Sequence, residues 1–123
     1  MNFSQKVLED QGIIETTLQD GITAEELKLG IDQALELSQQ RGINRFLIDA
    51  ADASSTIPLF NFYQLPKIYQ LINLPRVSRI AVLSATTRRG KQRARFFVNV
   101  CQNRGWQARM FYDRVQAVNW LQE

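Results

Sequence analysis

The alternation of strand-like and helix-like segments constrains the fold of this 123-residue chain more than any other feature. Short β-rich runs at 43–50, 79–84 and 107–112 are separated by stretches long enough to form helices. The run at 79–84 has an apolar centre and polar flanks, which is typical of a strand covered on both faces. Strands joined by helical crossovers pair in parallel, so the sequence predicts an α/β fold with a mostly parallel sheet.

An antiparallel hairpin is expected at the start of that sheet. β-rich residues at 7–8 and 13–18 flank Glu9-Asp10-Gln11-Gly12, whose composition is that of a turn. A chain of this length has the size of one domain. We therefore expect a single domain over residues 1–123, with a mixed sheet of about five strands, the N-terminal hairpin and about four helices.

Four segments carry helix signals. Thr23-Ala24-Glu25-Glu26 has the form of a capping box, and the apolar stripe behind it stops at Gly42. An apolar and aromatic stretch follows at 59–74, then a basic helix over about 91–104 and a last helix over 115–121. The side chains expected to form the core are Ile14, Leu18, Leu27, Ile31, Leu35, Phe46, Ile48, Ile80, Val82, Phe97, Cys101, Met110, Val118 and Leu121.

The chain contains no histidine and only one cysteine, Cys101. This excludes serine–histidine–aspartate and cysteine–histidine nucleophiles, metal sites that use histidine, and a histidine pH switch. Cys101 falls on the apolar stripe of the basic helix, which favours a buried structural thiol. The remaining acid–base pair is Asp49 and Asp52, for which bonding to loop amides and helix capping are the simpler roles. We therefore expect no catalytic residue, no metal, no cofactor and no enzyme activity.

Charge is strongly partitioned along the chain. Residues 1–52 hold ten acids and four bases, whereas residues 53–112 hold ten bases and no acid. Five cations crowd a strand-to-helix connection, where α/β sheets tend to bind ligands, and they are the predicted anion- or partner-binding residues: Arg88, Arg89, Lys91, Arg93 and Arg95.

Three other roles remain open for this basic segment. It is a solvated helix face, a subunit contact, or the intramolecular partner of the acidic helix that carries Glu25, Glu26, Asp32 and Glu36. Specific nucleic-acid binding is not expected, because the neighbouring Phe96 and Phe97 fall inside the helix, at core spacing.

The stretch at 59–74 is apolar on nearly all sides, with Lys67 and Gln70 as the positions expected to meet water. A helix of that kind is covered on more than one face, and one sheet hides only one of them. The second face is expected to contact another subunit, a partner or an apolar ligand, with a homodimer as the commonest case. The aromatic residues of this predicted surface are Phe60, Phe62, Tyr63 and Tyr69.

No leader-like apolar run begins the sequence, and no apolar run approaches the ~20 residues that span a bilayer. We expect a cytoplasmic protein without a membrane span.

Four segments in order, at 20–27, 79–83, 111–113 and 117–121, resemble the SpoIIAA-like proteins of the STAS/SEC14-type superfamily. The resemblance covers nearly the whole chain. It implies a mixed sheet with helices largely on one side, in a bacterial, cytosolic, non-enzymatic regulatory module similar to anti-sigma-factor antagonists. The partner would be a kinase or a switch protein. The SEC14-like branch implies an alternative, a carrier of a small amphipathic or lipid-like anionic ligand that uses the aromatic stretch and the basic segment.

The same resemblance suggests phosphorylation. Antagonist-type domains carry a phosphorylated serine in an Asp-Ser-Gly-like turn after a central strand, and here the matching segment offers Ser54, Ser55 and Thr56. The match is partial, because no glycine follows the serines and Ile57-Pro58 stands where the next helix would open. The alternative is that these hydroxyls only cap that helix and bond the loop backbone.

Overall fold

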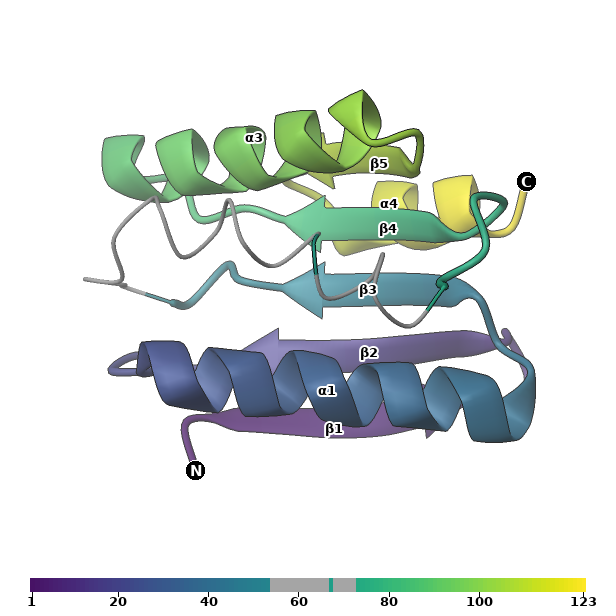
Figure 1. Ribbon diagram of the computed structural model, residues 1–123. Helices are drawn as coiled ribbons and strands as arrows, with labels where there is room; N and C mark the ends of the chain where they lie inside the picture. Colours follow the sequence, from purple (N-terminus) through teal and green to yellow (C-terminus); the bar gives the residue numbers. More distant parts are fainter. Residues whose placement is uncertain (54–66, 68–72) are drawn as a thin grey trace.

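The protein is an α/β structure built on one five-stranded mixed sheet (Figure 1). The computed structural model describes residues 1–53, 67 and 73–123. The strands β1 and β2 form an antiparallel hairpin, and β2, β3, β4 and β5 are parallel neighbours in the order of the chain. The bounds are β1 Phe3–Leu8, β2 Ile13–Leu18, α1 Ala24–Arg41, β3 Arg45–Asp49, β4 Arg79–Leu83, α3 Arg88–Asn103, β5 Gln107–Phe111 and α4 Arg114–Leu121.

The predicted fold class, five-stranded sheet and N-terminal hairpin are confirmed. Three of the four expected helices lie in the described part of the chain as α1, α3 and α4. The fourth, expected at 59–74, falls almost entirely outside the described residues, although Lys67 is exposed as expected.

Local signals account for both ends of α1. The Thr23 hydroxyl accepts a hydrogen bond from the Glu26 backbone at 3.1 Å, and the Glu26 carboxylate accepts one from the Thr23 amide at 3.1 Å. The amide of Asn2 also donates to Glu26, and these bonds hold the pKa of that carboxyl below its usual value. Gly42 ends the helix with a φ of 66°, a left-handed conformation that glycine adopts without strain. The predicted capping box and C-terminal stop are thus confirmed.

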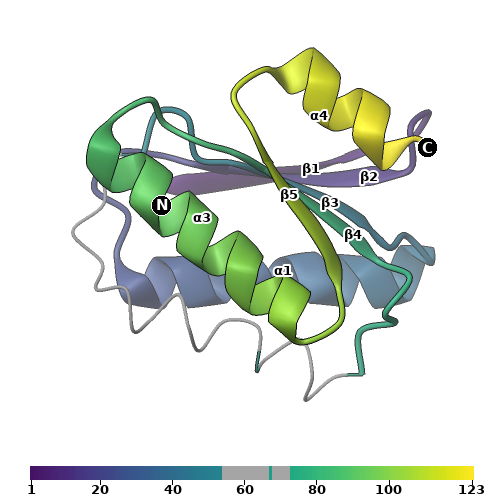
Figure 2. The same ribbon diagram turned by 90° about the horizontal axis from the view of Figure 1, so that it is seen from above.

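Helices cover both faces of the sheet. Figure 2 shows α1 and α3 on one side and α4 on the other. The face toward α1 and α3 packs a large cluster that includes Ile14, Ile80 and Val82, whereas Ile13 and Leu47 pack with α4. The implied placement of helices largely on one side therefore holds for two of these three helices, and α4 departs from it.

The core prediction holds for twelve of its fourteen residues, which are buried. Met110 and Val118 are only half-buried, because each lies at the margin of one of the two clusters. No helix among residues 1–53, 67 and 73–123 has the length and apolar character needed to cross a bilayer.

Candidate functional site

The N-terminal turns of α3 bring the basic segment to the carboxyl edge of the sheet. The chain leaves β4 at Leu83, and Thr87 caps α3 by accepting a hydrogen bond from the Gly90 amide at 3.1 Å. This cap corrects the expected start near residue 91, because the helix begins three residues earlier, at Arg88. The first cations are therefore already part of the helix.

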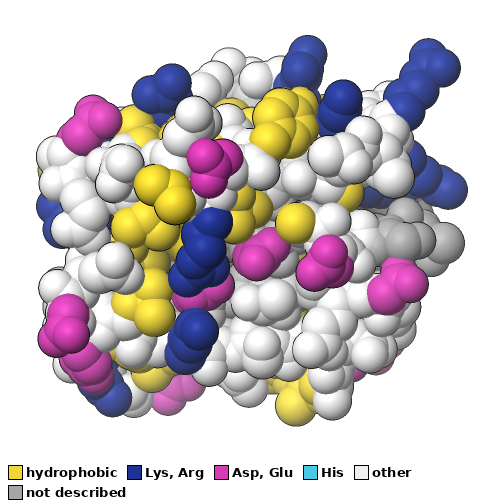
Figure 3. All heavy atoms as spheres, turned by 180° about the vertical axis from the view of Figure 1, so that it is seen from behind, with side chains coloured by type: hydrophobic (Ala, Val, Ile, Leu, Met, Phe, Trp, Pro, Cys, Tyr) yellow, Lys and Arg dark blue, Asp and Glu magenta, His cyan; other side chains and the backbone are white. Residues whose placement is uncertain are grey.

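Four of the five predicted cations are exposed, and we call them the cationic surface: Arg88, Arg89, Lys91 and Arg95. Their spacing along α3 places Lys91 and Arg95 one turn apart. In Figure 3, Lys and Arg side chains project at the end of the molecule where α3 begins. The first turn of α3 contains no acidic residue, so these cations repel both one another and the positive end of the helix dipole.

Arg93 is an exception and corrects the prediction. Its side chain is buried, with 9% exposure, because it lies four residues before Phe97 on the packed side of α3. Burial lowers the pKa of Arg93, and the charge of Arg89 lowers it further. Arg93 is therefore not part of the cationic surface.

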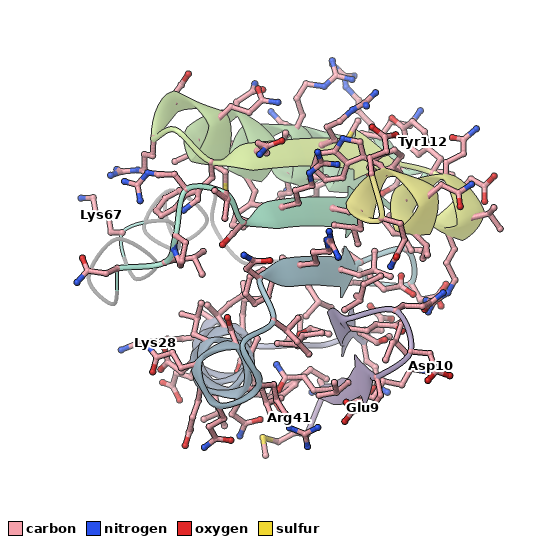
Figure 4. The ribbon with its side chains drawn as sticks, turned by 90° about the vertical axis from the view of Figure 1, so that its right-hand side faces the viewer. Glu9, Asp10, Lys28, Arg41, Lys67 and Tyr112 are labelled. Atoms are coloured by element: carbon pink, nitrogen blue, oxygen red, sulfur yellow. The ribbon has the colours of Figure 1, made fainter. Side chains whose placement is uncertain are left out.

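The acidic helix does not neutralise the cationic surface. Arg41 pairs with Glu9, and Lys6 and Arg114 pair with Glu15, whereas no ion pair within the described residues involves the cationic surface. Figure 4 shows Arg41 and Glu9 close together at the C-terminal end of α1. The intramolecular alternative therefore has no support within the part of the chain that the structure describes.

Tyr112 adds an aromatic side chain beside Lys91 of the cationic surface. The Lys91 ammonium lies 5.6 Å from the centroid of the Tyr112 ring, at the edge of cation–π range, and the tyrosine is 54% exposed. Tyr112 was not among the predicted site residues. The available signal was that 79–84 and 107–112 are consecutive parallel strands, whose carboxyl ends lie side by side.

The remaining predicted sites divide into two groups. The phosphorylation candidates Ser54, Ser55 and Thr56 and the aromatic surface Phe60, Phe62, Tyr63 and Tyr69 lie outside the described residues. The acid–base pair Asp49 and Asp52 and the thiol of Cys101 lie in the described part of the chain.

Asp49 accepts a hydrogen bond from the Ala51 amide at 3.1 Å, which is the structural role expected of it, and Asp52 is exposed. Cys101 is fully buried, and burial raises the pKa of its thiol to about 12, so the thiol is protonated at neutral pH. Within residues 1–53, 67 and 73–123, no three acidic or cysteine side chains gather closely enough to hold a metal ion.

An ion pair between a buried carboxylate and a partly exposed guanidinium lies on the α4 side of the sheet and was not predicted. Glu15 is 3% exposed, and the two terminal guanidinium nitrogens of Arg114 each donate a hydrogen bond to its carboxylate, Nη2 at 2.7 Å. Lys6 lies 3.9 Å away. The Arg114 hydrogen bonds hold the pKa of Glu15 below its usual value, although burial opposes them. The pair joins β2 to the first residue of α4.

Replacing Gly90 with alanine tests the start of α3. Alanine normally stabilises a helix interior by about 1 kcal/mol relative to glycine. Here a Cβ would stand 2.7 Å from the Ala85 Cβ and 2.9 Å from the Thr87 hydroxyl oxygen. We therefore expect Gly90→Ala to lower the free energy of unfolding by about 1–2 kcal/mol, measured by urea denaturation.

The control for this substitution is Gln92→Ala, at an exposed position of the same helix, which should change stability by less than about 0.5 kcal/mol. A Gly90→Ala protein at least as stable as the wild type would show that the turn at 85–87 does not need this glycine.

Comparison with known proteins adds no assignment: no protein-family model, curated protein or solved structure matches this chain.

Proposed function

We propose that this chain is a non-enzymatic regulatory module that binds an acidic partner protein through the cationic surface. One observation carries the proposal: Arg88, Arg89, Lys91 and Arg95 are exposed and form no ion pair within the described residues. An acidic partner would relieve both their mutual repulsion and their unfavourable position at the start of the helix.

The distribution of charge over the fold supports the same proposal. Figure 1 shows α1, which exposes Glu25, Asp32 and Glu36, over β1 and β2, while α3 lies toward the other end of the sheet. An acidic partner approaching this molecule is attracted at one end and repelled at the other. Such an arrangement orients the partner before contact and raises the association rate.

The proposal includes the SpoIIAA-like resemblance and control by phosphorylation at Ser54, Ser55 or Thr56. Residues 50–53, which lead from β3 to these three residues, support this part of the proposal. The chain leaves β3 at Asp49 and turns through a hydrogen bond from the Ala53 amide to the Ala50 carbonyl. Asp49 and Leu83 are register partners on neighbouring strands. The loop therefore starts at the same edge of the sheet as the cationic surface, where added phosphate would alter its charge.

The test is to capture binding proteins from the native host, identify one, and measure its affinity for defined variants. The variant Arg88→Gln/Arg89→Gln/Lys91→Gln should bind about 100-fold more weakly than the wild type, and wild-type binding should weaken with salt. The control Lys28→Gln removes a cation from exposed α1 and should change the affinity less than about twofold. Equal affinity of the wild type and the triple variant would refute the proposal.

Mass spectrometry tests the other parts of the proposal. An intact mass without added phosphate after exposure to the host's kinases would exclude control at the three hydroxyl residues. A native mass spectrum that shows a co-purified lipid would instead favour the carrier alternative. Captured nucleic acid that binds without sequence preference would indicate only nonspecific attraction.

A further inference from the structure

The first strand of the sheet has an open backbone edge. β1 occupies the end of the sheet, and among residues 1–53, 67 and 73–123 only β2 pairs with it. The carbonyls of Asn2 and Leu8 accept hydrogen bonds from the β2 side, from Gln19 at 2.9 Å and Gly12 at 2.8 Å. Because backbone groups alternate in direction along a strand, the N–H and C=O groups of residues 3, 5 and 7 point away from the sheet. No group in the described part of the chain pairs with them.

The opposite edge of the sheet, at β5, is shorter and partly blocked. The Phe111 carbonyl accepts a hydrogen bond from Ser84 on the β4 side, so the backbone groups of Ala108 and Met110 point outward. The Gln102 side chain of α3 already donates to the outward carbonyl of Ala108 at 2.8 Å. Strand addition is therefore favoured at β1, whose outward backbone groups are open, over β5, where one outward carbonyl is already bonded.

We propose that β1 pairs with β1 of a second copy of this chain, antiparallel and about a two-fold axis at Gln5. In that register Phe3 lies opposite Val7 of the second copy, and Gln5 lies opposite Gln5. All three outward-facing residues then form hydrogen-bonded pairs, with about six new backbone hydrogen bonds in total. The two sheets become one continuous sheet, and the interface is the same on both copies, as a closed dimer requires.

The charged side chains select this register. It places Lys6 opposite Ser4 of the second copy, so no like charges meet. A shift that paired residue 5 with residue 7 would set Lys6 against Lys6, and it would lose one of the hydrogen-bonded pairs. The Gln5 amide bonds Thr16 at 3.1 Å and the Gly30 carbonyl, so its side chain does not cover the open edge.

The flank of α1 above β1 is compatible with a second copy. Gly30 packs on the Phe3 ring, which identifies the side of α1 that lies over β1. The charged positions on that flank, Glu26 and Arg41, are bound within the chain by Asn2 and Thr23 and by Glu9. Three further positions are uncharged, and one of them, Leu29, is 39% exposed, although leucine favours burial. They are Leu29, Gln33 and Leu37, whereas the exposed acids Glu25, Asp32 and Glu36 lie farther round the helix.

The test combines sedimentation with amide hydrogen exchange on the full chain. Sedimentation at micromolar concentration should give about twice the monomer mass of 14.2 kDa. The amides of Phe3, Gln5 and Val7 should exchange slowly at high concentration and faster on dilution, whereas those of Ser4 and Lys6 should stay protected at both. A monomer at all concentrations tested, or a dimer in which the three outward amides remain unprotected, would overturn the proposal.

Ser4 provides a register-specific variant, because its side chain is exposed. Ser4→Lys would place lysine opposite Lys6 twice in each dimer and should raise the dissociation constant about tenfold. Ser4→Glu should lower it a few-fold. Gln116→Lys adds the same charge on exposed α4 and should leave dimerisation unchanged. A dimer equally stable in both Ser4 variants would exclude this register and point to another surface, such as the predicted aromatic one.

Discussion

Arg114→Met is expected to lower the free energy of unfolding by about 2–3 kcal/mol at neutral pH. The substitution leaves the Glu15 carboxylate at 3% exposure without its two guanidinium hydrogen bonds. An ionised group buried without its partner is strongly destabilising, more so than the pair is stabilising. Lys6, at 3.9 Å, compensates only in part, because its side chain is 65% exposed. Urea denaturation measures the loss.

A second pair of variants separates the unpaired charge from lost packing. Glu15→Met/Arg114→Met removes both charges, so it should recover most of the stability lost in Arg114→Met. Lys6→Met should cost less than about 0.5 kcal/mol, since its contact with Glu15 is long and exposed to solvent. If the double variant were no more stable than Arg114→Met, the loss would come from the Arg114 side chain and not from the charge of Glu15.

The pH dependence of this effect has a definite sign. In the wild type Arg114 holds the pKa of Glu15 below its ordinary 4.5. The stabilising contribution of the ionised carboxylate is therefore complete above about pH 4.5, and it is lost as the pH falls through the depressed folded-state value. In Arg114→Met burial remains and raises that pKa, so protonation stabilises the folded variant as the pH falls. The difference between the two proteins should narrow in acid.

Local signals predicted most of the scaffold. The helix α1 has its capping box and its terminal glycine in consecutive sequence, and the parallel order of β2 to β5 follows from alternating strands and crossovers. The placement of α4 on the second face of the sheet was not predicted. Adjacent apolar residues such as Ile13 and Ile14 point to opposite faces, so each needs its own cover, and α4 supplies one.

The Glu15–Arg114 pair was not predictable in the same way. Glu15 follows two apolar residues in β2, next to the edge strand β1. Its partner Arg114 stands 99 residues later in the chain. No local pattern joins positions so far apart. The pair becomes visible only when α4 is placed on the sheet.

The candidate site was predicted in composition but not in detail. The five cations within residues 88–95 look alike in the sequence, but helical spacing places four of them on the exposed side of α3 and one on the packed side. Arg93 stands four residues before Phe97 and next to Ala94, both buried, so its position on the packed side could have been deduced. Tyr112 could be placed beside Lys91 only after the order of β4 and β5 was known.

The second large effect is expected at Trp120, which attaches α4 to the sheet. Trp120→Ala should lower the free energy of unfolding by about 3–5 kcal/mol, a large part of the 5–15 kcal/mol typical of a domain. The ring is 7% exposed and packs against Phe111 with centroids 5.8 Å apart. The guanidinium of Arg79 lies 5.3 Å from the ring and also donates to the Trp120 carbonyl at 2.7 Å.

Two controls show whether packing or the cation contacts dominate. Trp120→Phe keeps an aromatic ring, so it should retain more than half of the stability, and it leaves Trp106 as the single fluorescence reporter. Arg109→Met removes a cation 5.8 Å from the ring and should cost less than about 1 kcal/mol, because Arg109 is exposed. Because α4 contributes only Ala117, Trp120 and Leu121 as buried residues, it has little else to hold it. If Trp120→Ala unfolded at nearly the wild-type urea concentration, α4 would not be part of the cooperatively folded core. The Glu15–Arg114 ion pair would then be the main contact that holds α4 on the sheet.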